Sequence, residues 1–88
     1  MKLIIAILKY EDTENVSNAL ISANFRVTYI ASTGGFLRHG SNTLMIGLGD
    51  EQVETAIEII RNVCAPSVDQ NYKRATLFVL NVGHFDQL

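Results

Sequence analysis

The sequence is short of cysteine, proline and charge. Its 88 residues include one cysteine, one proline and no tryptophan. A single cysteine excludes an intrachain disulfide, which suits a reducing compartment, and we expect a cytoplasmic location. The apolar run at residues 3–8 is too short for a secretory signal or a membrane span. We therefore expect no membrane insertion.

Basic residues are too few for a protein that binds a nucleic-acid polymer. Seven Lys and Arg against nine Asp and Glu give a formal net charge of −2, so no basic surface is expected for a phosphate backbone. Only 18% of the residues are charged, 48% are hydrophobic, and the mean hydropathy is +0.18. We expect a single domain over residues 1–88 that hides further apolar surface in an oligomer.

Hydrophobic periodicity predicts four strands and two helices. The expected strands are residues 2–9, 25–32, 42–48 and 74–82. The first helix is expected to start with Asp12 or Thr13 as N-cap and to end at Asn24, a residue that tolerates the left-handed conformation. The second is expected to be capped by Asp50 and stopped by Pro66. This β-α-β-β-α-β order predicts a ferredoxin-like α+β fold, with two helices on one face of a four-stranded antiparallel sheet.

The first and last strands are apolar on both faces. Leu3, Ile5 and Ile7 alternate with equally apolar neighbours, and the last strand repeats the pattern around Phe78 and Leu80. Two helices on one side can cover only one of these faces. Another copy of the chain is the simplest cover for the second face.

Polar side chains on the second strand are the best candidates for a site. Asn24, Arg26 and Thr28 have the spacing of one strand face, and an amide, a guanidinium and a hydroxyl can bind a base edge and a phosphate. On spacing alone, a solvated sheet edge is the more favoured interpretation. The following Gly34-Gly35-Phe36 could bring backbone N–H groups to an anion and an aromatic ring to a base, but it is a weak motif by itself.

No metal or nucleophile motif is present. His39, His84 and Cys64 lack the spacing of zinc ligands, and Cys64 falls on the apolar stripe of the second helix, which predicts a buried thiol. The acidic residues at 50, 51, 54 and 58 are expected to form a solvated helix face. We therefore expect no metal and no cofactor.

A longer pattern of residues resembles a known family. It consists of residues 24–28 (Asn-Phe-Arg-Val-Thr), 32–38 (Ser-Thr-Gly-Gly-Phe-Leu-Arg), Gly40, Asn42-Thr43 and Gly47. The pattern resembles the cyclic di-AMP receptor family of PII-like signalling proteins. The resemblance implies a ferredoxin-like homotrimer that binds one cyclic di-AMP at each subunit interface and signals to an unknown downstream protein without catalysis. The ligand contacts that it implies are Asn24, Arg26, Thr28, Gly35, Phe36, Leu37, Gly47, Phe78 and Gln87.

One departure from the family keeps alternatives open. Family members carry a long loop between the second helix and the last strand, and here this segment is only residues 64–74. A related sensor of another nucleotide or small metabolite is the first alternative, and an oligomer without a ligand is another. An acylphosphatase-like enzyme shares the strand order, but Lys9-Tyr10-Glu11-Asp12 stands where such enzymes carry a glycine-rich phosphate loop.

Overall fold

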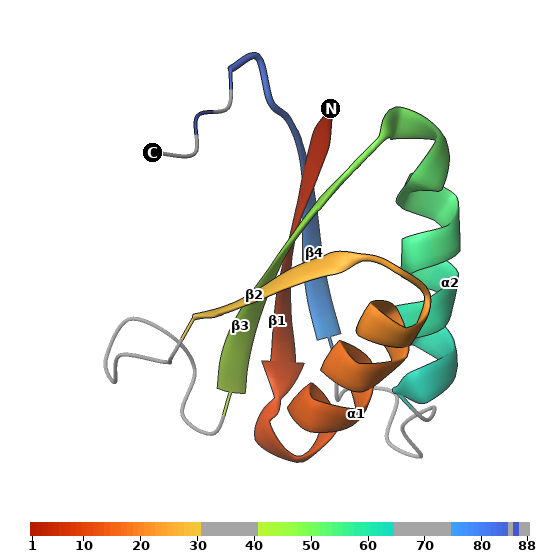
Figure 1. The fold of residues 1–88 in the computed structure, drawn as a ribbon. Helices are drawn as coiled ribbons and strands as arrows, with labels where there is room; N and C mark the ends of the chain where they lie inside the picture. The colour runs from red at the N-terminus through yellow and green to blue at the C-terminus, as the bar shows by residue number, and fades with distance from the viewer. Residues whose placement is uncertain (31–40, 65–74, 85, 87–88) are drawn as a thin grey trace.

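The computed structural model describes residues 1–30, 41–64, 75–84 and 86. The elements in chain order are β1 (Lys2–Lys9), α1 (Tyr10–Ser22), β2 (Arg26–Ile30), β3 (Ser41–Leu48), the 3₁₀ turn η1 (Asp50–Gln52), α2 (Val53–Val63) and β4 (Ala75–Asn81). Figure 1 shows α1 and α2 lying on the same side of the strands. The short segment at residues 64–74 falls almost wholly outside the described residues.

The four strands form one antiparallel sheet in the order β2-β3-β1-β4. The central strand β1 pairs with β3 along one edge and with β4 along the other, so the two β-α-β halves of the chain interleave. The predicted ferredoxin-like α+β arrangement is confirmed. Strand β1 also has the predicted bounds.

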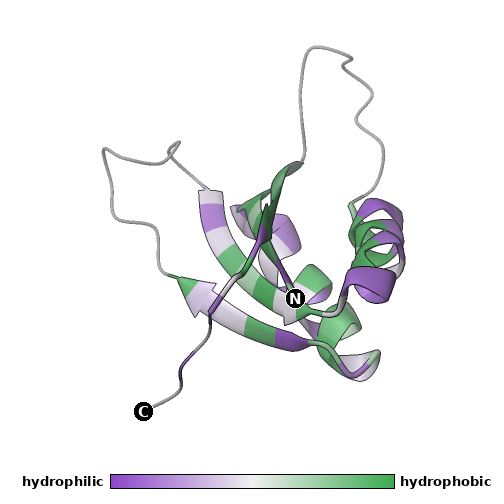
Figure 2. Cartoon of the chain, turned by 90° about the horizontal axis from the view of Figure 1, so that it is seen from above, coloured by the Kyte–Doolittle hydropathy of each residue, from purple (hydrophilic) through white to green (hydrophobic). Residues whose placement is uncertain are grey.

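Alternate residues of β1 form the centre of the core. Ile4, Ala6 and Leu8 are at most 1% exposed, because their side chains all point towards the helices. The other core residues are Val16, Leu20, Phe25, Leu44, Ile46, Leu48, Ala56, Ile60 and Cys64. Both helices carry hydrophobic as well as hydrophilic residues, as Figure 2 shows, which is the pattern expected of helices that pack on a core with one face. Truncating a fully buried leucine in such a core typically costs about 2–5 kcal/mol. The predicted burial of Cys64 is confirmed.

Both helix starts differ from the prediction. Helix α1 begins at Tyr10 with Lys9 as N-cap. Thr13 is inside the helix and donates its hydroxyl proton to the Lys9 carbonyl at 3.0 Å, a bond that threonine can make to the preceding turn. Asp12 or Thr13 as N-cap was therefore wrong. Asp50 also does not cap α2, because it opens η1, whose N-cap is Gly49, and α2 starts three residues later.

Asn24 ends α1 and does not belong to a strand. Its φ is 70°, in the left-handed region where asparagine is tolerated better than most residues. The next N–H group, of Phe25, bonds back to the Leu20 carbonyl at 3.0 Å and closes the helix. The predicted helix end is therefore confirmed. The predicted strand at residues 25–32 starts one residue late, at Arg26, and its last two residues are outside the described part.

Candidate functional site

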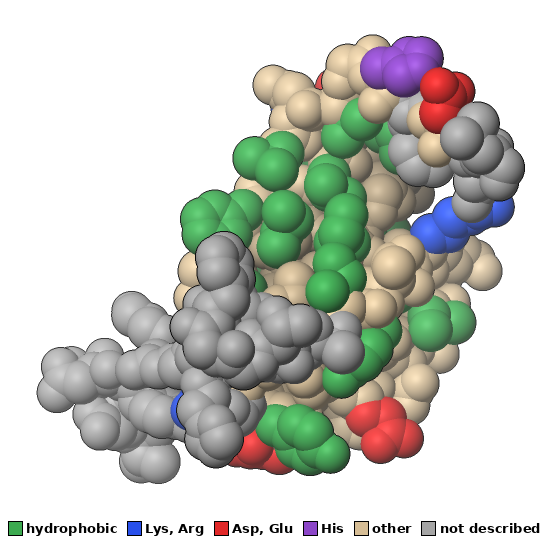
Figure 3. Space-filling model, turned by 90° about the vertical axis from the view of Figure 1, so that its left-hand side faces the viewer, with side chains coloured by type: hydrophobic (Ala, Val, Ile, Leu, Met, Phe, Trp, Pro, Cys, Tyr) green, Lys and Arg blue, Asp and Glu red, His purple; other side chains and the backbone are tan. Residues whose placement is uncertain are grey.

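The sheet face turned away from the helices is apolar at its centre. Leu3, Ile5 and Ile7 of β1 are half-buried on this side, while Phe78 and Leu80 of β4 are 50% and 46% exposed. Figure 3 shows hydrophobic side chains gathered on this side of the molecule. The predicted second apolar face is therefore present, and nothing in the described part of the chain covers its β4 side.

Cross-strand register brings Arg26 and Thr28 next to this apolar centre. Gly47 of β3 lies opposite Arg26 of β2 on one side and Leu3 of β1 on the other. Met45 of β3 lies opposite Thr28 of β2 and Ile5 of β1. Residues directly opposite each other in antiparallel strands share a face. The guanidinium and the hydroxyl of β2 therefore project on the same side as the apolar residues of β1.

A hollow of about 360 Å³ opens at this place, and we call it the sheet hollow. Its lining residues are Met1, Leu3, Arg26, Thr28, Met45, Gly47, Val82 and Asp86. Gly47 contributes no side chain to the floor. A Cβ atom there would lie 3.2 Å from the Cε of Met1, closer than the usual 3.5–4.0 Å or so between carbon atoms. Because this atom ends a flexible, exposed side chain, a small shift of Met1 can admit a methyl group, whereas a larger side chain would take up space in the hollow.

Opposite charges line the sheet hollow. Arg26 is exposed and is the one basic residue among the described lining residues. Asp86 is the one acid of that set, and its Oδ2 lies 2.8 Å from the Nε2 of His84. An exposed guanidinium beside a hydroxyl and apolar walls suits a ligand with an anionic group and a flat apolar body.

The structure brings together three of the predicted contacts. Arg26, Thr28 and Gly47 line the sheet hollow, whereas Asn24 lies in the turn before β2, so its predicted place on a strand face with the other two was wrong. Phe78 lies on the same sheet face, but it pairs with Ile5 on the far side of β1 and does not line the hollow. Four predicted contacts lie outside the described residues: Gly35, Phe36, Leu37 and Gln87. A ligand contact remains a prediction for all nine.

Sequence reasoning missed five lining residues: Met1, Leu3, Met45, Val82 and Asp86. Leu3 and Met45 could have been found only from the register, since they join the hollow as cross-strand neighbours of Gly47 and Thr28. Asp86 follows the last strand and carries no sequence signal of its own.

Thr43 is a further polar residue on this sheet face. It lies opposite Ile30 and Ile7, is 6% exposed, and its hydroxyl has no hydrogen-bond partner among the described residues. Buried hydroxyl groups are normally paired, because an unmade hydrogen bond is costly. A water molecule, another subunit or a ligand can supply this missing hydrogen bond.

Comparison with known proteins assigns the chain to a family. Residues 1–70 match the family model described as cyclic-di-AMP receptor. The chain belongs to the cyclic-di-AMP receptor family. The resemblance predicted from residues 24–47 is therefore confirmed, although the family match ends before β4 and does not include Phe78 or Gln87.

A solved structure supports the fold over the rest of the chain. It is described as a functionally unknown protein from Pediococcus pentosaceus ATCC 25745 and is 34% identical to this chain. The match covers 99% of this chain and 96% of that one, with a TM-score of 0.77. The likeness thus includes β4, which the family match leaves out.

Two further features of the described residues concern membranes and metals. Neither helix there is long and apolar enough to span a membrane. The same residues contain no group of three or more His, Cys, Asp and Glu side chains placed to hold a metal ion.

Proposed function

We propose that the sheet hollow binds cyclic di-AMP and that the protein passes this signal to a partner protein without catalysis. The observation that carries the proposal is the meeting of Arg26, Thr28 and the bare backbone of Gly47 at one hollow, in a member of the cyclic-di-AMP receptor family.

The lining suits the two parts of this ligand. Arg26 can donate charge-assisted hydrogen bonds to a phosphate, and Thr28 adds a neutral donor. Leu3 and Met45 offer apolar surface to an adenine face.

We further propose that the ligand lies between subunits of a homotrimer. The hollow of about 360 Å³ is at the small end of the range of roughly 300–1,000 Å³ typical of sites that enclose a drug-sized ligand. A cyclic dinucleotide therefore needs further walls. The exposed side chains of Phe78 and Leu80 continue the same face and offer the apolar contact area that neighbouring subunits require.

The link between β1 and α1 argues against an acylphosphatase-like enzyme. Strand β1 ends at Lys9 and α1 begins at the next residue, Tyr10. A phosphate loop needs several residues between strand and helix, and this connection has none. A sensor of another nucleotide remains the alternative.

Calorimetric titration with cyclic di-AMP, beside cyclic di-GMP, ATP and AMP, tests the ligand, and light scattering of the same sample tests the assembly. We expect saturable binding of one cyclic di-AMP per chain, at least tenfold weaker binding of the others, and a trimeric mass. Absence of heat with cyclic di-AMP contradicts the proposed ligand. A monomeric mass with binding intact contradicts only the interface.

A further inference from the structure

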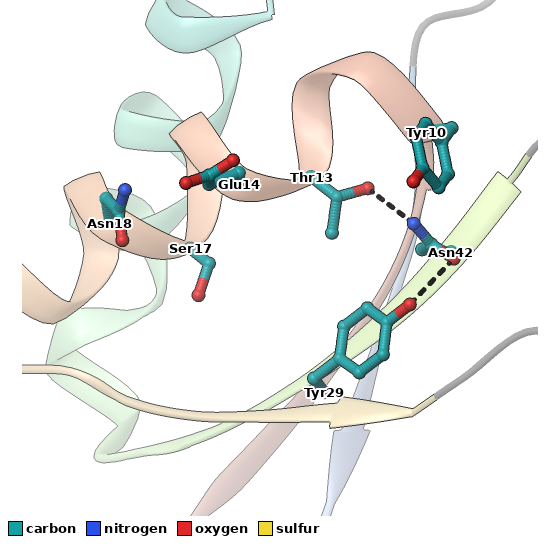
Figure 4. Close-up of a pocket in the computed structure, with 7 residues that line it drawn as sticks. All are labelled: Tyr10, Thr13, Glu14, Ser17, Asn18, Tyr29 and Asn42. Carbon is teal, nitrogen blue, oxygen red and sulfur yellow. Dashed lines mark hydrogen bonds between the residues drawn. The ribbon is translucent and has the colours of Figure 1, made fainter.

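A second hollow lies on the other side of β2, between this edge strand and α1. Its volume is about 380 Å³, and we call it the edge hollow. Its lining residues are Tyr10, Thr13, Glu14, Ser17, Asn18, Tyr29 and Asn42. Figure 4 shows Thr13 and Ser17 on the helix and the ring of Tyr29 rising from β2 on the facing side. Tyr29 alternates with Arg26 and Thr28 along β2, so the two hollows open on opposite faces of the sheet.

A chain of three hydrogen bonds crosses the wall of the edge hollow. The Tyr29 hydroxyl donates to the Asn42 Oδ1 at 3.1 Å, and the Asn42 Nδ2 donates to the Thr13 Oγ1 at 3.2 Å. Thr13 then donates to the Lys9 carbonyl at 3.0 Å. Figure 4 shows the first two bonds. The chain thus runs from the mouth of the hollow to the backbone at the start of α1.

The Lys9 carbonyl fixes the direction of this chain. A carbonyl oxygen can only accept, so the Thr13 hydroxyl uses its one proton there and can only accept from Asn42. The amide of Asn42 must therefore turn its nitrogen to Thr13 and its oxygen to Tyr29. Tyr29 in turn uses its one proton on Asn42. Asn42 is 6% exposed, so this network is held inside the protein.

Two groups that line the edge hollow can only accept hydrogen bonds. The Tyr29 hydroxyl has no proton left for a ligand and can only accept from one. Glu14 adds an exposed carboxylate, which is also acceptor-only when ionised. Tyr29 and Glu14 therefore favour a ligand that donates hydrogen bonds, although Ser17, Asn18 and the Tyr10 hydroxyl also line the hollow and can donate.

The charge and the aromatic groups of the edge hollow point the same way. Glu14 is the one acid among the described lining residues, and none of them is basic. Tyr10 and Tyr29 are 69% and 56% exposed, so their rings are available to a ligand. Tyrosine faces attract organic cations, most strongly where water is partly excluded.

We infer that the edge hollow binds an organic cation that carries an ammonium or guanidinium group. These groups have hydrogen-bond donors and no acceptor, which complements the acceptors of Tyr29 and Glu14. The site is separate from the sheet hollow and does not depend on the function proposed for it. The same chemistry can come from a free small cation or from a basic side chain of a partner protein.

Nuclear magnetic resonance titration with ethylguanidinium chloride at constant ionic strength tests this inference. Ethylurea is the matched neutral probe, because it has a similar shape but lacks the charge and carries an acceptor. We expect saturable shifts of the Ser17, Asn18 and Tyr29 backbone amides with ethylguanidinium only. Equal shifts with ethylurea, or no shifts with either probe, would overturn the inference.

Three variants assign the effect to the edge hollow. Glu14→Gln removes the charge at an exposed position and should weaken ethylguanidinium binding about two- to fivefold. Tyr29→Phe keeps the ring but removes the oriented hydroxyl, and should weaken binding at least threefold. Glu54→Gln removes an exposed charge from α2 and should change nothing. Equal effects of Glu14→Gln and Glu54→Gln would show general charge attraction and overturn the site, even if Tyr29→Phe failed to fold.

The source of the cation is distinguished by a third probe, the blocked tripeptide Gly-Arg-Gly. Binding at least tenfold tighter than that of ethylguanidinium would assign the edge hollow to an arginine side chain of a partner protein. Similar affinities would assign it to a free small cation. Both results support a cation site, while tripeptide binding that Glu14→Gln leaves unchanged would contradict it.

Discussion

Removing the guanidinium of Arg26 should lower the affinity for the ligand without changing the stability of the fold. Among the described residues no ion pair or hydrogen bond holds this side chain, and it is exposed, so Arg26→Ala should change the free energy of unfolding by less than about 0.5 kcal/mol. A charge-assisted hydrogen bond to a ligand phosphate contributes about 1.5–3 kcal/mol. We therefore expect a loss of cyclic di-AMP affinity of roughly ten- to a hundredfold, measured by calorimetry beside thermal unfolding of the ligand-free protein.

Arg61 provides the matched control. It is exposed on α2, and its Nη1 lies 2.6 Å from the Oε1 of Glu58, a surface pair worth about 1 kcal/mol or less. Arg61→Ala removes the same charge and should leave the affinity unchanged. Arg26→Lys keeps the charge without the planar fork of arginine, so its affinity should fall in between. Equal losses from Arg26→Ala and Arg61→Ala would refute a phosphate contact at Arg26.

Three further substitutions test neighbouring parts of the reasoning. Gly47→Val suits a strand but fills the floor of the sheet hollow, so calorimetry should show cyclic di-AMP affinity more than tenfold lower in a folded protein; unchanged affinity would place the ligand elsewhere. Asn24→Ala should have a free energy of unfolding about 1 kcal/mol lower than that of Asn24→Gly, measured by thermal unfolding, because alanine resists the φ of 70°. Both variants should bind cyclic di-AMP more weakly than the unchanged protein if the Asn24 amide contacts the ligand. Phe78→Lys puts a charge on the apolar sheet face and should reduce the mass in light scattering from trimer to monomer; a persistent trimer would locate the interface elsewhere.

The fold followed from the sequence where the pattern was strong. The bounds of β1 came out as predicted because an unbroken apolar run lies between Lys2 and Lys9. The start of α1 did not, because Thr13 and its acidic neighbours resemble a capping sequence, whereas the Thr13 hydroxyl bonds back to the preceding turn. Asn24 suited both a helix end and a strand face. The hydrogen bond from the Phe25 N–H to the Leu20 carbonyl closes the helix and places Asn24 at the helix end.

The candidate site was less accessible from sequence. Strand alternation was enough to place Arg26 and Thr28 on one face, but it cannot say which residues of other strands stand beside them. Gly47 came from the family resemblance, and Leu3 joined it only through the observed register. The edge hollow had no local signal. Asn42 joins β3 to β2 through Tyr29 and to α1 through Thr13, and sequence periodicity treats these three elements separately.

The alternation of β2 and β3 limits how this family member can change in evolution. An inserted or deleted residue within a strand turns every following side chain to the opposite face. In β3, such a change before Met45 would move Gly47 towards the core and direct a core side chain into the sheet hollow. In β2, it would exchange the side of Tyr29 with that of its neighbours and so remove both hollows in one step. New ligand preferences in these strands must therefore arise by substitution, whereas changes of length are confined to the connecting segments.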